Sequence, residues 1–193
     1  MNVGVDEAGR GCIIGPLVMA ACVDPGFLVK DSKLYSKKQR DELFSKLVCL
    51  PHVAVSIPVW VLEQGNMNDI ECLVTSIMLS HFSFTTAYVD CPSINLKAYK
   101  TQLSKLVEGN LVVQHKAEEH HCVAAASIIA KVYRDQTLAY LKNKYDVDCG
   151  SGYLSDSKTQ DFLKKNWAKY PQIFRRHWKP YKDLCQSTLN QYV

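Results

Sequence analysis

The sequence lacks the long apolar run that a membrane-spanning helix needs, which is about 20 consecutive residues. Its most apolar run, residues 13–23, is shorter and contains Gly15 and Pro16. The sequence also lacks an internal repeat, a low-complexity linker and the basic-then-apolar start of a signal peptide. With 193 residues, of which 47% are hydrophobic and 22% charged, the composition is that of one globular domain. A fibrous repeat, a wholly disordered chain and a multi-span membrane protein are excluded.

No two cysteines have the Cys-x-x-Cys spacing that zinc sites usually show. The eight cysteines are scattered, mostly in apolar segments, where a free thiol behaves as a small hydrophobic side chain. We therefore interpret them as reduced thiols and expect an intracellular protein, cytoplasmic or nuclear.

The net charge is small, formally +4 at pH 7, but it is unevenly distributed. Residues 158–182 contain eight Lys or Arg and one acidic residue, a net charge of +7, with Trp and Tyr between them. This pattern is typical of a surface that binds phosphate backbones. A solvated helix face with inward aromatic rings gives the same pattern, and the two interpretations are compatible.

The spacing of apolar residues predicts strands and helices that alternate after an initial pair of strands. Strands are expected at residues 3–5, 15–23, 53–59, 85–89 and 111–114. Helices are expected at residues 36–50, 69–82, 96–107, 120–145 and 159–170. This order predicts one α/β domain over residues 1–193, with a mixed sheet, helices on its faces and a basic helical region from about residue 155.

Acidic residues stand where predicted strands end, although they are poor strand formers. Asp6 and Glu7 end the first strand before a glycine-rich turn, Asp90 ends a later strand, and Glu118 and Glu119 precede the longest helix. Carboxylates that converge without Cys or His partners suit hard cations such as Mg²⁺ or Mn²⁺. The matching chemistry is two-metal phosphoryl transfer, in which one ion activates a water and the other stabilises the leaving oxygen. For Asp90, a turn or capping role is the alternative.

Six short segments follow one another along almost the whole chain and are specific only in combination. They are Asp6 to Gly11 with Gly15 to Val18, Asp31-Ser32-Lys33, Tyr88-Val89-Asp90, Ala124 to Asp135, Gly150 to Asp156, and Phe174 to Trp178. Together these segments resemble the type 2 ribonuclease H family, ribonuclease HII.

The resemblance implies a ribonuclease H-like fold, with a mixed sheet of roughly five strands flanked by helices and a small helical C-terminal part. It implies a metal-dependent endoribonuclease that cleaves the RNA strand of RNA–DNA hybrids and single ribonucleotides in duplex DNA. The products would carry 3′-hydroxyl and 5′-phosphate ends, and the role would be removal of ribonucleotides and RNA primers in DNA replication and repair. The alternatives are another nuclease of this fold, such as a junction resolvase, and an inactive nucleic-acid-binding homologue.

The resemblance assigns the catalytic, metal-binding carboxylates to three positions: Asp6, Glu7 and Asp90. The fourth carboxylate departs from the family pattern, an Asp ten residues before the Ser of the long-helix signature, because Ala117 stands ten residues before Ser127. We select Glu118, which resembles the Glu of the sister family ribonuclease HIII, and keep Glu119 as the alternative.

The resemblance also implies the substrate contacts. In the family, the backbone of a Gly-Arg-Gly turn and a Tyr recognise the ribose at the RNA–DNA junction, and the matching residues here are Gly9, Arg10, Gly11 and Tyr153. The 2′-hydroxyl is the group that separates RNA from DNA at a given position. Lys33 is a candidate phosphate contact. For Tyr153 considered without the family, burial in the core is the alternative.

Residues 186–193 form a short tail that resembles the box by which replication proteins dock on sliding clamps. Gln186, Leu189 and Tyr192 occupy the matching positions, and Val193 stands where a second aromatic residue is usual. An ordinary frayed terminus is the alternative. We expect a monomer, and the sequence leaves open whether accessory subunits are needed.

Overall fold

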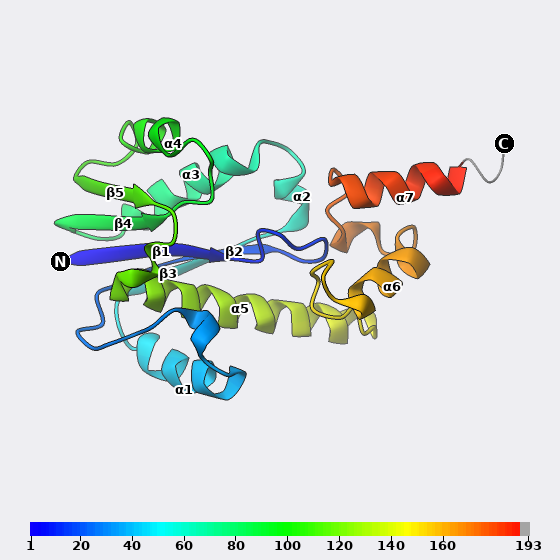
Figure 1. Cartoon of the computed structure of the whole chain (residues 1–193), viewed down its shortest axis with the longest axis horizontal. Coiled ribbons are helices and arrows are strands. Elements are labelled where there is room, and N and C mark those ends of the chain that lie inside the picture. The colour runs from blue at the N-terminus through cyan, green and yellow to red at the C-terminus, as the bar shows by residue number, and fades with distance from the viewer. Residues whose placement is uncertain (190–193) are drawn as a thin grey trace.

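The computed structural model describes residues 1–189, with side chains as far as residue 186. Its centre is a five-stranded sheet in the order β3-β2-β1-β4-β5 (Figure 1). The strands are β1 (Asn2–Ala8), β2 (Leu17–Val23), β3 (His52–Ile57), β4 (Thr86–Asp90) and β5 (Asn110–Gln114). The first three strands pair antiparallel, whereas β4 and β5 run parallel to β1. The prediction of one mixed sheet is therefore confirmed.

Helices cover both faces of the sheet, with α1 and α5 on one face and α3 and α4 on the other (Figure 1). The helices are α1 (Lys37–Leu47), α2 (Val59–Leu62), α3 (Met67–Leu79), α4 (Leu96–Leu103), α5 (His121–Tyr145), α6 (Ser157–Asn166) and α7 (Lys179–Leu189). Single 3₁₀ turns occupy Ser32–Leu34, Ala117–Glu119 and Pro171–Ile173. All seven residues of β2 are buried, because helices cover this strand on both sides. Within the described part of the chain, no helix is long and apolar enough to cross a membrane.

Capping residues set several element boundaries. Ser36 begins α1 as predicted, because its hydroxyl accepts the Gln39 N–H and the Gln39 side chain accepts the Ser36 N–H. β3 ends at Ile57, earlier than predicted, because Pro58 cannot donate to a sheet and precedes α2 instead. Asp156 caps α6 and starts it two residues before the predicted position.

Helix α5 lies directly on β1 at Gly4. A Cβ atom at this position would be 2.2 Å from the Cys122 carbonyl carbon and 2.2 Å from the Val123 nitrogen. The small buried residues 124–126 continue the close contact along the helix, as the alanine run predicts. Glycine at position 4 therefore sets the distance between the start of α5 and the strand that carries Asp6.

The C-terminal region packs on the loop between β1 and β2. Isolated β-bridges join Cys12 to Tyr153 and Ile14 to Phe174, and Ile13 and Ile14 are buried in a cluster with the aromatic rings of the C-terminal region. The aromatic residues thus pack inward, as one of the two interpretations expected. Helix α7 continues to Leu189, so residues 186–189 of the expected tail are helical, and residues 190–193 lie outside the described residues.

We predict that Gly4→Ala destabilises the fold by about 1–3 kcal/mol or more, because the added methyl meets backbone atoms that no rotamer change can move. Chemical denaturation measures the free energy of unfolding. Gly65→Ala is the matched control, since its nearest neighbours would be 3.9 Å away, and it should be neutral or stabilising by up to about 1 kcal/mol. Equal unfolding midpoints for the two variants would contradict the role assigned to Gly4.

Candidate active site

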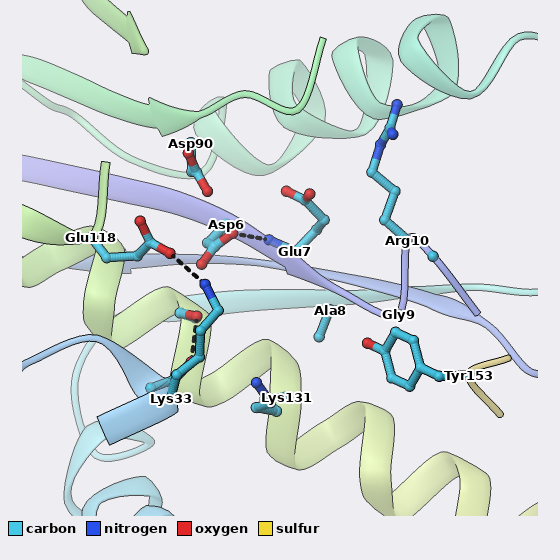
Figure 2. Close-up of a pocket in the computed structure, with 13 residues that line it drawn as sticks. Asp6, Glu7, Ala8, Gly9, Arg10, Lys33, Asp90, Glu118, Lys131 and Tyr153 are labelled. Carbon is cyan, nitrogen blue, oxygen red and sulfur yellow. Dashed lines mark hydrogen bonds and ion pairs between the residues drawn. The ribbon is translucent and has the colours of Figure 1, made fainter. Parts of the chain in front are cut away.

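Three carboxylates from three parts of the chain meet beside the C-terminal ends of the parallel strands β1 and β4. Asp6 lies near the end of β1, Asp90 ends the parallel neighbour β4, and Glu118 lies in the 3₁₀ turn between β5 and α5. Carboxylate oxygens of these residues all lie within 4.8 Å of one another (Figure 2). The structure thus brings together three of the four carboxylates that the sequence singles out.

Burial and like charge raise the pKa of the central carboxyl. Asp6 is only 4% exposed, and its pKa rises to about 7, first because of burial and then because of the Asp90 charge. Hydrogen bonds from Ser127 and from the Glu7 N–H oppose this rise. Burial likewise raises the pKa of Asp90, and the Ala117 N–H opposes it. A group of oxygen donors whose negative charge is only partly compensated fits a hard divalent cation.

Lys33 supplies a partial counter-charge to this group. Its ammonium lies 3.4 Å from Glu118 Oε1 and 3.8 Å from Asp31 Oδ2, and it reaches the carboxylates from the far side of the cavity (Figure 2). The Lys33 side chain is 70% exposed, so it is free to change partners when an anion or a cation arrives.

Glu7 lines the same cavity but does not join the group of three. Its carboxylate lies to one side of Asp6, towards Arg10 (Figure 2). Burial raises the pKa of Glu7 well above its usual range, with further rises from Asp6, Glu71 and Asp90. The predicted four-carboxylate set is therefore divided into three close carboxylates and one neighbour.

The structure separates the two candidates for the fourth carboxylate. The Glu118 side chain is 12% exposed and faces Asp6 and Asp90. Glu119 instead accepts a hydrogen bond from Gln114 Nε2 at 2.9 Å, and its side chain is 69% exposed. Lys116, in the left-handed conformation, precedes this turn, and the two adjacent glutamates differ in that only Glu118 joins Asp6 and Asp90.

The Gly-Arg-Gly turn and Tyr153 form the other wall of the cavity. Gly9 has a φ of +87°, and a Cβ there would lie 2.8 Å from the Pro16 carbonyl oxygen, so only glycine fits. Tyr153 lies beside Gly11, with the Arg134 guanidinium 5.0 Å from the centre of its ring. Burial and the Cys12 thiol raise the pKa of Tyr153 to about 12, which keeps its hydroxyl protonated as a hydrogen-bond donor.

One cavity of about 230 Å³ is lined by all nine site residues that the sequence analysis selected. Four further residues line it that the sequence patterns do not single out as site residues: Ala8, Ser32, Ser127 and Lys131. Ser127 and Lys131 are four residues apart on α5 and therefore share a helix face, a spacing that could have revealed them. Ser32 precedes Lys33, and its hydroxyl lies 3.1 Å from that of Ser127.

Comparison with known proteins agrees with this geometry. Residues 3–181 match the family model described as Ribonuclease HII. The ribonuclease HII of Archaeoglobus fulgidus is 38% identical, and the match covers 100% of both chains. The chain belongs to the ribonuclease HII family. The solved ribonuclease H2 of Pyrococcus horikoshii OT3 has a TM-score of 0.84 at 33% identity, covering 96% of this chain and 97% of that one.

Membership of ribonuclease HII identifies the enzyme class. The protein is a type 2 ribonuclease H, a hydrolase that degrades RNA in RNA–DNA hybrids and depends on a metal. The ribonuclease H-like fold is confirmed by the same matches. Of the functions considered from the sequence, the family thus selects the ribonuclease over a resolvase-like nuclease.

One of the eight basic residues between positions 158 and 182 does not face solvent. Arg175 is 1% exposed and donates hydrogen bonds to the carbonyl oxygens of Gly9 at 2.6 Å, of Gly15 at 3.3 Å, and of Arg10. Burial lowers its pKa to about 10, so it stays charged at neutral pH. Arg175 therefore does not belong to the basic surface that the charge pattern of residues 158–182 predicts, and instead holds the turn of the ribonuclease HII site. The other seven are exposed.

We predict that Glu118→Gln weakens Mn²⁺ binding by at least about tenfold, because it removes one of three close anionic oxygen donors. Glu119→Gln is the matched control and should bind Mn²⁺ within about twofold of the unaltered enzyme. Isothermal titration calorimetry of the metal-free protein measures both. Loss of binding in Glu119→Gln alone would reverse the assignment.

Proposed function

We propose that this enzyme cuts duplex DNA at a single embedded ribonucleotide as well as cutting RNA in hybrids. Cleavage falls on the 5′ side of the ribonucleotide and leaves 3′-hydroxyl and 5′-phosphate ends. The observation that carries this proposal is the shared cavity, because the carboxylates form one wall and the Gly-Arg-Gly turn with Tyr153 forms the other. A ribose that contacts the turn is then within reach of the group that performs the cut.

The proposed metal ligands are the three close carboxylates of Asp6, Asp90 and Glu118, with Glu7 as a further ligand from the side. Mg²⁺ and Mn²⁺ both suit donors that are carboxylate oxygens. When bound, such ions activate a water and stabilise the leaving oxygen. Ser127 keeps the Asp6 carboxylate oriented through its hydroxyl.

The proposed substrate contacts divide between ribose and phosphate. The backbone of Gly9, Arg10 and Gly11 and the Tyr153 hydroxyl would contact the 2′-hydroxyl, which DNA lacks. Lys33 and Lys131 border the same cavity and would contact the phosphates of the cleaved strand. The exposed basic residues of the C-terminal region would add sequence-independent attraction to the duplex.

A duplex DNA with one ribonucleotide, incubated with Mg²⁺ or Mn²⁺, tests the proposal directly. We predict cleavage on the 5′ side of the ribonucleotide, which Asp6→Asn and Asp90→Asn abolish together with hybrid cleavage. Tyr153→Ala should lower cleavage of this duplex by about tenfold or more, because a positioned hydrogen bond to the ribose is lost.

Product ends are identified by gel mobility and by ligation of the 3′-hydroxyl. The same sequence without the ribonucleotide is the substrate control, and Glu119→Gln is the protein control, which should cleave normally. Cleavage of all-DNA junctions, or equal rates for Tyr153→Ala and the unaltered enzyme on the single ribonucleotide, would contradict the proposed recognition.

We also propose that the enzyme docks on a sliding clamp through Gln186, Leu189 and Tyr192. A solved complex joins PCNA to the ribonuclease HII of Archaeoglobus fulgidus, and a chain of that complex resembles this one with 36% identity and a TM-score of 0.83. Gln186 is exposed on α7, and this helix lies at the end of the molecule opposite the N-terminus (Figure 1). Tyr192 and the Leu189 side chain lie outside the described residues.

We predict that removal of residues 186–193 abolishes capture by immobilised Archaeoglobus fulgidus PCNA and leaves hybrid cleavage without a clamp unchanged. A pull-down with purified proteins measures capture, and the cleavage assay shows that the truncated enzyme is folded. Leu189→Ala with Tyr192→Ala in the full chain is the matched variant and should behave like the truncation. Equal capture of the full and shortened chains, or no capture of either, would rule out this docking site.

A further inference from the structure

The side chain of Arg10 leaves the cavity although its backbone forms the cavity wall. It extends to α3 (Figure 2), where Nε donates to Glu71 Oε1 at 2.8 Å and Nη2 donates to Asn68 Oδ1 at 2.7 Å. Asn68 Nδ2 in turn donates to Ser93 Oγ at 3.4 Å, in the segment that follows β4. The Arg10 guanidinium is therefore an anchor that joins the turn to a neighbouring helix.

Glu71 is an unusual residue for its place in the fold. It is 1% exposed within the apolar layer that α3 shares with the sheet, and burial raises its pKa while Arg10 opposes the rise. Its second oxygen, Oε2, has no hydrogen-bond partner among the described residues. A half-satisfied buried ion pair contributes little to stability compared with apolar residues of similar volume. Its contribution lies instead in the position that it gives to Arg10.

The turn is also held from its other side. Arg175 donates to the carbonyl oxygens of Gly9 and Arg10, so residue 10 is fixed at its backbone by the C-terminal region and at its side chain by α3. Removal of the α3 contact would leave the turn attached but free to shift relative to Tyr153. The carboxylates of Asp6 and Asp90 lie on β1 and β4 and would stay in place.

We infer that Glu71 is a positioning residue for ribose recognition: through Arg10 it fixes the Gly-Arg-Gly backbone relative to Tyr153 and so sets the preference for single ribonucleotides. This inference rests on the proposed function. A duplex with one ribonucleotide offers a single 2′-hydroxyl, which must meet the turn in one geometry. A hybrid offers a 2′-hydroxyl at every RNA position and tolerates a displaced turn, because several registers lead to a cut.

The test compares kcat/KM for two substrates, a duplex with one ribonucleotide and a uniform RNA–DNA hybrid of the same length. Glu71→Gln keeps the shape and one acceptor but removes the charge that holds the guanidinium. We expect the single-ribonucleotide value to fall by about tenfold or more, and the hybrid value by less than about threefold. Arg10→Lys should give the same change in ratio, and the double variant should add little to either, because both changes break one contact.

Glu63→Gln is the matched control. Glu63 is also a shielded glutamate paired with an arginine, with a side chain 9% exposed that accepts hydrogen bonds from Arg176, but it does not line the cavity. This variant should leave the substrate ratio unchanged. The rise in melting temperature on Mn²⁺ binding should match that of the unaltered enzyme in both glutamate variants, since the three carboxylates are untouched.

Each outcome decides between the inference and the function on which it rests. An unaltered ratio in Glu71→Gln, an equal fall for both substrates, or the same shift in Glu63→Gln overturns the role of Glu71 and leaves the proposed function standing. Failure of the unaltered enzyme to cut the single ribonucleotide overturns both. If Glu71→Gln does not fold, Asn68→Ala removes the other arm of the anchor at a half-buried position and must shift the ratio in the same direction.

Discussion

The site depends on the backbone contact between β1 and α5 at Gly4. Because no Cβ separates them, the first turns of α5 lie close enough for Ser127 to bond Asp6 and for the preceding turn to deliver Glu118. A larger side chain at position 4 would push the helix outward and move Glu118 away from Asp6 and Asp90. The mutual repulsion of the three carboxylates opposes folding, so the packing of the α5 interface must overcome it before any cation binds.

Three arginines, rather than acidic or apolar residues, shape the wall opposite the carboxylates. Arg10 points to α3, Arg175 binds carbonyl oxygens of the turn, and Arg134 lies under Tyr153 with hydrogen bonds to Cys12 and Ser151. Planar guanidinium groups suit this task because each has five donors in a fixed geometry. Buried carbonyl oxygens of an irregular glycine-rich loop would otherwise lack partners.

Much of the fold and site could be predicted from the sequence, because strand ends and family motifs are local signals. Asp6 and Asp90 stand near the ends of apolar strands, and this position makes them recognisable as candidate site residues. Glu118 is preferred to Glu119 in the sequence only through the resemblance to ribonuclease HIII, because no residue pattern shows that Glu118 faces Asp6 and Asp90 while Glu119 is exposed. The burial of Arg175 could not be predicted either, because its partners at Gly9 and Gly15 are about 160 positions away in the chain.

The same long-range contacts imply an order in which the two walls of the cavity form while the chain is being synthesised. The three close carboxylates and the sheet are complete once residue 118 and the start of α5 have left the ribosome, whereas Tyr153 and Arg175 follow much later. Since domains begin to fold during synthesis, a nascent chain can gather these three carboxylates before it has the parts that hold the turn. The group of three carboxylates is thus encoded early, and the opposite wall of the cavity, with the Gly-Arg-Gly turn and Tyr153, is completed only when the C-terminal part packs on the first loop.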